Sequence, residues 1–109
     1  MKKGVYVKKT DITVKENKEP CRDVELRVRL DNNDIFERVV SVTAEIFDAQ
    51  KQCITACSKK AFLEGMGRTD AELAVFLVNP NPHLYRARIT VQEYEKELDT
   101  DVQTFCVLN

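Results

Sequence analysis

The sequence predicts an all-β protein, with seven antiparallel strands stacked as a two-layered sandwich in one domain of 109 residues. Three observations lead to this class. Apolar and polar residues alternate with a period of two along most of the chain. Turn-forming residues separate the alternating segments at short intervals, which is typical of sandwiches. No long segment has a convincing helical period, and the best helical candidate, residues 56–66, starts weakly.

The first half of the chain contains four of the predicted strands. Residues 5–14 form one long edge strand, which we expect to be bulged near residues 9–10. Residues 24–30 alternate between apolar and charged side chains, and the Asp-Asn-Asn-Asp sequence that follows them favours a turn. Residues 40–46 form the third strand, and a short polar turn leads into the fourth, at residues 52–58.

The second half contains the other three strands. Residues 73–78 are apolar on both faces, and the segment 79–82 ends that strand because proline cannot donate to a β-ladder. Residues 85–91 alternate cleanly between apolar and polar side chains. A last strand is predicted over residues 102–108.

Composition excludes several classes of partner. The formal net charge is −1 and the isoelectric point is about 5.9, whereas nucleic-acid-binding domains more often have a basic face. The longest apolar runs are far shorter than the roughly 20 residues that cross a bilayer. No apolar segment follows the lysines near Met1, so no signal peptide is predicted. We expect no nucleic-acid or membrane partner, and the location of a parent protein is left open, with a periplasmic or secreted bacterial protein as one option.

Residues suited to active-site chemistry are scarce. His83 is the only histidine and is interpreted as a loop residue at a strand entrance, and the close pair Gly65 and Gly67 lacks the rest of a phosphate-binding loop. Three glutamates within residues 93–97 alternate at an expected hairpin tip, on a solvated edge and not in a pocket where two carboxylates could act as acid and base. We therefore expect no catalytic residue in this chain and no enzymatic activity of the chain alone.

The four cysteines, Cys21, Cys53, Cys57 and Cys106, do not form an evident metal or disulfide framework. On one strand, Cys53 and Cys57 would lie about 13 Å apart, and a disulfide needs Cα atoms within about 7 Å. The paired Cys-x₂-Cys spacing of zinc sites is absent. We expect four buried or half-buried free thiols and no metal or other cofactor, with a disulfide from Cys21 or Cys106 to a distant partner as the alternative.

Charge is distributed unevenly along the chain. Residues 1–22 carry seven basic and three acidic side chains, whereas residues 93–101 carry five acidic and one basic. We interpret these segments as two solvated surfaces that attract each other across neighbouring strands. The alternative is a surface that steers a partner domain.

Several short motifs carry a family resemblance. Tyr85 opens the sixth strand, where immunoglobulin-like sandwiches often place a tyrosine whose hydroxyl bonds to the backbone at a corner; a core aromatic is the alternative. Asn32 follows the second strand, and Asp99 stands six residues before Phe105. The entrance to the sixth strand reads Asn79-Pro80, then Pro82-His83-Leu84-Tyr85. In this order the motifs resemble the immunoglobulin-like sandwich domain of family 2 glycoside hydrolases, the β-galactosidase, β-glucuronidase and β-mannosidase group.

The resemblance covers nearly the whole chain, which departs from the family pattern in its closing residues, Phe105-Cys106-Val107-Leu108, and in having no tryptophan. It implies a seven-stranded antiparallel immunoglobulin-like β-sandwich over residues 1–109, as a fragment of a larger multidomain enzyme. In that family the sandwich lies between a jelly-roll domain and the catalytic barrel, which would be its partners, and the barrel carries the catalytic glutamates. The parent would hydrolyse β-glycosidic bonds, as β-galactosidase does, and this chain would act as an interdomain scaffold.

Two alternatives stay open. One is a free-standing adhesion or interaction module of immunoglobulin or fibronectin-III type, because such domains share this architecture without sharing sequence. The other is a carbohydrate-binding module, which would use exposed aromatic side chains as sugar platforms. The chain has no tryptophan and three tyrosines, so it offers few such platforms.

Overall fold

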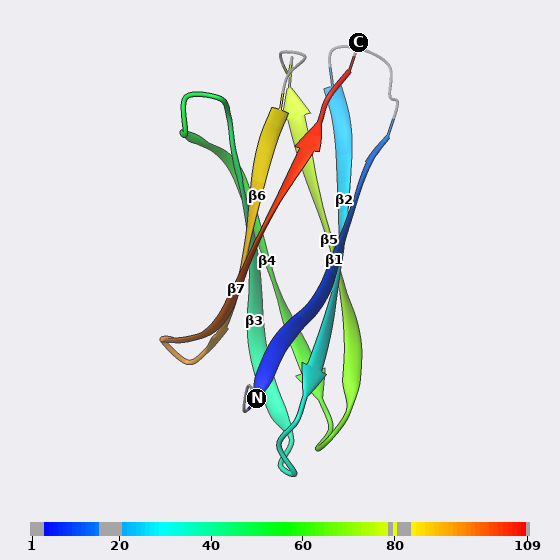
Figure 1. Ribbon diagram of the computed structural model, residues 1–109, viewed down its shortest axis with the longest axis vertical. Coiled ribbons are helices and arrows are strands. Elements are labelled where there is room, and N and C mark those ends of the chain that lie inside the picture. Colours follow the sequence, from blue (N-terminus) through cyan, green and yellow to red (C-terminus); the bar gives the residue numbers. More distant parts are fainter. Residues whose placement is uncertain (1–3, 16–20, 79, 81–83, 109) are drawn as a thin grey trace.

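The structure is a computed structural model that describes residues 4–15, 21–78, 80 and 84–108. These residues form seven antiparallel strands and no helix, so the described part contains no helix that could cross a membrane (Figure 1). The all-β class and the number of strands are confirmed. In chain order the strands are β1 (Val5–Lys15), β2 (Cys21–Asn32), β3 (Arg38–Phe47), β4 (Cys53–Leu63), β5 (Arg68–Val78), β6 (Leu84–Glu93) and β7 (Lys96–Cys106).

Two sheets pack face to face. One has the strand order β1-β2-β5 and the other β4-β3-β6-β7, and every hydrogen-bonded pair is antiparallel. The chain crosses between the sheets after β2, after β4 and after β5, and this arrangement confirms the immunoglobulin-like sandwich. The molecule is elongated along the strands, with extents of 46 × 24 × 21 Å.

The core lies between the sheets and uses alternate residues of each strand. On β2 the inward residues of the predicted pattern are at most 1% exposed, while the charged residues between them face solvent. Burial of a Val, Leu or Ile side chain stabilises a fold by about 1.5–3 kcal/mol, so this alternation drives the sheets together. The largest fully buried side chains are Leu26, Leu30, Ile46, Leu63, Ile89, Val5, Val24, Val28, Val40, Val42, Val91 and Val107.

Two local predictions about strand edges are confirmed. The β1–β2 register shifts between Val7 and Lys9, which is the irregularity expected in the N-terminal strand. β5 ends at Val78, before the proline-containing segment, and the extra apolar residues on its second face, Phe76 and Val78, are exposed.

The helical candidate over residues 56–66 is wrong. Most of it belongs to β4, which also runs five residues beyond the predicted strand end at Ser58. Ala61 and Leu63 face the core and Phe62 between them is exposed, which is a period of two. Alanines and lysines suit a helix, but pairing with β3 along residues 56–63 decides the conformation.

The bounds of the last strand were also misplaced, because β7 begins at Lys96 and not at Val102. Edge position explains the error: among the first nine residues of β7, none is fully buried, so no alternation marks the segment. β7 nevertheless pairs with β6 along its full length, from Lys96 opposite Glu93 to Cys106 opposite Leu84.

All four cysteines lie in described segments and are free thiols, and Cys53 and Cys57 share β4 as expected. Cys21 and Cys57 are half-buried, and burial raises the pKa of the Cys57 thiol. Cys53 and Cys106 are exposed, so the prediction of four buried or half-buried thiols is wrong for these two. Both lie on the edge strands of the four-stranded sheet, where one side of the strand has no neighbour to cover it.

Candidate functional site

The aromatic residues of the family motif meet in the core. Tyr85 and Phe105 are opposite each other on β6 and β7, and their rings stack with centroids 5.7 Å apart. Both side chains are buried, which confirms the interpretation of Tyr85 as an aromatic residue of the core. A hydrogen bond from its hydroxyl to the backbone at a corner of the sandwich stays a prediction. Leu84 is exposed beside them and Pro80 is half-buried. The other motif residues of this segment, Asn79 and Pro82, lie outside the described residues, as does His83.

Asp99 lies elsewhere and joins the two sheets. Its Oδ2 accepts a hydrogen bond from the backbone nitrogen of Val7 at 2.8 Å, and Asp101 accepts one from Thr10 Oγ1 at 2.9 Å. The acidic segment on β7 therefore contacts β1 directly. The two segments meet through a backbone N–H and a hydroxyl, and the attraction between their opposite charges stays a prediction.

Two connections, residues 33–37 between β2 and β3 and residues 64–67 between β4 and β5, close one end of the sandwich, and the connection 94–95 between β6 and β7 projects to the side nearer that end (Figure 1). We call this the three-loop end. It is also the end at which the described chain begins, and the backbone oxygen of Gly4 accepts a hydrogen bond from the nitrogen of Asn33.

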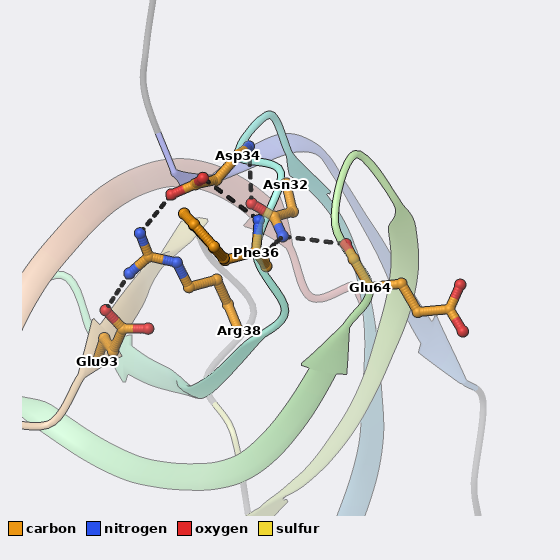
Figure 2. Close-up of polar contacts among 6 residues, drawn as sticks. All are labelled: Asn32, Asp34, Phe36, Arg38, Glu64 and Glu93. Carbon is orange, nitrogen blue, oxygen red and sulfur yellow. Dashed lines mark hydrogen bonds and ion pairs between the residues drawn. The ribbon is translucent and has the colours of Figure 1, made fainter.

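Asn32 ties two of these connections together. Its Nδ2 donates to the backbone oxygens of Phe36 at 2.9 Å and Glu64 at 3.0 Å, and its Oδ1 accepts from the backbone nitrogen of Asp34 at 3.0 Å (Figure 2). The residue is only 2% exposed, so these bonds replace those that water would make. Both amide protons and the carbonyl oxygen are thus engaged, and a buried polar group becomes a rigid clamp.

Arg38 ties in the third connection. Its guanidinium binds Asp34 on one side and Glu93, the last residue of β6, on the other at 2.6 Å (Figure 2). The hydrogen bond from Arg38 lowers the pKa of Asp34 below its ordinary value, and the two carboxylates raise the pKa of Arg38. A carboxyl group whose pKa is lowered in this way is poorly suited to donate a proton.

Gly65 allows the connections to pack closely. A Cβ at this position would stand 2.1 Å from the backbone oxygen of Ile35, which no side chain can tolerate. The next residue, Met66, donates its backbone N–H to the oxygen of Asp34 at 2.7 Å. The β4–β5 connection is therefore fitted against the β2–β3 connection, backbone on backbone.

Carboxylates elsewhere face cations across the outer surface of the three-stranded sheet. Glu72 lies 3.1 Å from Arg27 and Asp70 lies 3.3 Å from Arg29, in register across β2 and β5. These are exposed ion pairs, each worth little in stability. Among the described residues, no three His, Cys, Asp or Glu side chains gather so that they could hold a metal ion.

No protein-family model matches the sequence, and no curated protein sequence matches it significantly. Solved structures do match. A β-glucuronidase from glycoside hydrolase family 2 superposes on 96% of this chain with a TM-score of 0.90 at 12% identity, over 13% of its own chain. The β-glucuronidase of Bacteroides uniformis matches 94% with a TM-score of 0.88 at 13% identity, over 14% of its chain. The exo-chitosanase of Amycolatopsis orientalis matches 95% with a TM-score of 0.82 at 16% identity, over 13% of its chain.

The chain has the fold of one domain of family 2 glycoside hydrolases. This result confirms the fold that the order of the motifs predicted, the sandwich of family 2 glycoside hydrolases. The chain spans only 13–17% of the length of these structural neighbours. The neighbours include a glucuronidase and a chitosanase, so a β-galactosidase specificity is not confirmed.

Sequence reasoning found part of the three-loop end and missed the rest. The position of Asn32 after the second strand marked it, and the turn residues that follow it are typical of a connection. The partners of Arg38 were not foreseen, because Glu93 is 55 residues away in the chain. The sequence shows only that Asp34 and Arg38 are four residues apart, a spacing that suggests an ion pair in a helix but not at the start of a strand.

Proposed function

We propose that this chain is a non-catalytic sandwich domain, residues 1–109, of a larger glycoside hydrolase of family 2 type, and that it holds neighbouring domains in register. One observation carries the proposal: at least 94% of the chain superposes on a segment that makes up 13–17% of such enzymes. The partners would be other domains of the same polypeptide, a jelly-roll domain and a catalytic barrel.

The shape of the molecule suits a spacer between domains. Among the described residues, β1 begins nearer one end of the long axis, which extends 46 Å, and β7 finishes nearer the other (Figure 1). Hydrogen bonds between β1 and β7 join the two sheets at the side, and the clamps at the three-loop end fix the connections. Domains attached before and after this body would be held apart at a set distance.

The reaction of the parent would be hydrolysis of a β-O-glycosidic bond with retention, by two carboxylates supplied from the barrel. A β-galactoside is the substrate expected from the family resemblance. By name, the structural neighbours include a putative β-galactosidase, β-glucuronidases and an exo-chitosanase, so a panel of β-galactoside, β-glucuronide and β-glucosaminide is the appropriate assay.

The assay compares the purified 109-residue chain with its parent polypeptide on chromogenic members of this panel. We expect the parent to release the chromophore from at least one glycoside and the chain alone to release none. Turnover by the chain alone, at a rate that persists after controls for contaminating hydrolase, would overturn the non-catalytic assignment.

The coding sequence on either side of this chain distinguishes the proposed domain from a free-standing adhesion module. A barrel encoded downstream supports the proposal, and tandem sandwiches support the alternative. A carbohydrate-binding module fits less well, because the strongly exposed aromatic side chains Phe36, Phe62, Phe76 and Tyr94 line none of three grooves on the described surface. One of these grooves has aromatic residues, but its Tyr85 is buried and Arg88 covers the ring of Phe47, 5.1 Å from its centroid. Saturable binding in oligosaccharide titrations would favour that alternative.

A further inference from the structure

The solvent-facing side of the four-stranded sheet, which we call the outer face, carries several large apolar side chains. They are between 44% and 61% exposed and come from all four strands: Val39, Ile54, Phe62, Leu84 and Val102. We propose that the outer face binds the outer face of a second copy of the chain, around a two-fold axis that crosses the strands. This inference goes beyond the proposed function and does not rest on it.

Strand register shows that these residues share one surface. Val39 and Phe62 are opposite each other on β3 and β4, near the three-loop end. Val102 on β7 is opposite Arg88 on β6, nearer the other end of the face. Two grooves run over the face, and Arg88 lines both of them. The outer face is therefore continuous along the strands.

The shape of the face suits a reciprocal contact. In Figure 1 the connection 48–52 between β3 and β4 and the connection 94–95 between β6 and β7 project to the same side, at opposite ends of the four-stranded sheet. One groove lies beside the first connection, and Tyr94, 97% exposed, stands on the second. A two-fold axis across the strands turns one end onto the other. The β6–β7 connection of each copy then meets the groove of its partner, which closes the pair.

The groove contains cations that lack partners. Its lining includes Lys51 on the β3–β4 connection and Arg86 and Arg88 on β6. Glu45 binds Arg88 at 2.8 Å, and Asp48, the one acid of the lining, accepts hydrogen bonds from the backbone of its own connection. Within the described part of the chain, neither Lys51 nor Arg86 has an ion-pair partner for its side chain. The groove is therefore suited to carboxylates.

The opposite end of the face supplies carboxylates. Glu95 and Glu97 are exposed on and beside the β6–β7 connection, with Lys96 between them. On β4 and just after it, Lys60 and Glu64 are exposed on the outer side. Acids outnumber bases at this end, whereas bases outnumber acids at the groove. The two-fold arrangement therefore brings opposite charges together twice, and stacking with like ends together would bring like charges together.

The middle of the face, where the axis would pass, is uncharged. It is a row of hydroxyl groups, one from each strand: Ser58, Thr43, Thr90 and Thr100. A face four strands wide and eight residues long measures about 500 Å², so the pair would bury about 1,000 Å² in total. That area is at the lower limit for a specific interface, so we expect a reversible dimer that forms at micromolar concentrations and above.

Sedimentation equilibrium of the 109-residue chain tests the proposal. Reducing buffer is needed because Cys53 and Cys106 are exposed and could otherwise form a disulfide between copies. Between about 1 µM and about 1 mM, we expect the mass to rise from 12.5 kDa towards twice that value. Phe62→Ser should raise the dimer Kd at least about tenfold. The control, Phe76→Ser, removes an equally exposed phenylalanine from the other sheet and should leave the Kd unchanged. A mass of 12.5 kDa throughout overturns the proposal.

A charge swap tests the two-fold arrangement itself. Arg86→Glu and Glu95→Arg should each raise the Kd at least about tenfold, because the contact between them occurs twice in the dimer. The double variant should return the Kd to within about threefold of the natural value, because the pair is restored with its charges exchanged. Arg68→Glu, an exposed change on β5 of the other sheet, is the control. A double variant that binds no more tightly than either single variant overturns the arrangement.

Two further outcomes also decide the question. Association into steadily larger species, with no plateau at the dimer, would mean that the contact does not close and would overturn the two-fold axis. A dimer that neither Phe62→Ser nor Arg86→Glu weakens, with both variants folded by their melting temperatures, uses another surface and overturns the proposal. Because every measurement uses the chain itself, the result does not depend on whether the proposed function is correct.

Discussion

At the scale of single residues, the three-loop end depends on two polar side chains that are satisfied in different ways. Asn32 is buried and makes three hydrogen bonds to backbone groups, whereas Arg38 and Asp34 form an ion pair that is a quarter to a third exposed. The first kind of contact contributes through the cost of leaving buried groups unpaired. The second contributes through charge and therefore depends on pH.

Replacement of Asn32 with alanine should lower the free energy of unfolding by about 3 kcal/mol, because the two carbonyl oxygens and one N–H that it engages would lose their partner in a buried site. Urea denaturation measures the change. Glu37→Ala, an exposed change on the same connection, should alter stability by less than about 0.5 kcal/mol. A loss below about 1 kcal/mol for Asn32→Ala would show that water replaces the clamp.

The contribution of the Asp34–Arg38 ion pair to the free energy of unfolding should be lost in acid. The folded pKa of Asp34 is below its unfolded value, so its stabilising contribution is complete above the ordinary aspartate pKa of about 3.9 and is lost as the pH falls through the folded pKa. Between pH 6 and pH 3 the free energy of unfolding should therefore fall more steeply for the natural protein than for Asp34→Asn. Parallel curves from denaturation at each pH would contradict this assignment.

At the scale of elements, alternation predicts a strand well where every second residue is buried and poorly where few residues of the strand reach the core. β2 lies between two strands and shows a clean pattern, and its inward residues were identified from the sequence. β4 and β7 are edge strands, and the errors in the helical candidate and in the last strand both fall on them. Only Ala61 and Leu63 of β4 and Phe105 of β7 are buried, so the binary signal is weak along these two strands, and pairing with the neighbouring strand sets the conformation.

The β4–β5 connection should respond in opposite directions to two substitutions. Gly65→Ala places a Cβ against the backbone oxygen of Ile35 and should destabilise the fold by about 2 kcal/mol. Met66→Gly relieves a left-handed backbone and should stabilise it by about 1 kcal/mol. Thermal unfolding measures both, and a shift in the same direction for the two variants would contradict the close approach described for this turn.

At the scale of the whole molecule, the apolar core holds the two sheets together, and polar contacts close the sandwich at its side and at one end. Contacts between segments far apart in the chain, such as Val7 with Asp99 and Arg38 with Glu93, close its side and its three-loop end. The architecture was predictable because it follows from local alternation and turn residues. These closing contacts were not, since they depend on how the two sheets are stacked.

The central claim is that this body is one part of a much longer glycoside hydrolase. The most direct test is the mass of the polypeptide that contains it, read by immunoblot of source-cell extracts with an antibody raised against this chain. Because the match covers 13–17% of the enzymes, the account predicts a band of about 600–800 residues, or roughly 70–90 kDa. A single band at 12.5 kDa, the mass of the 109-residue chain alone, would contradict it.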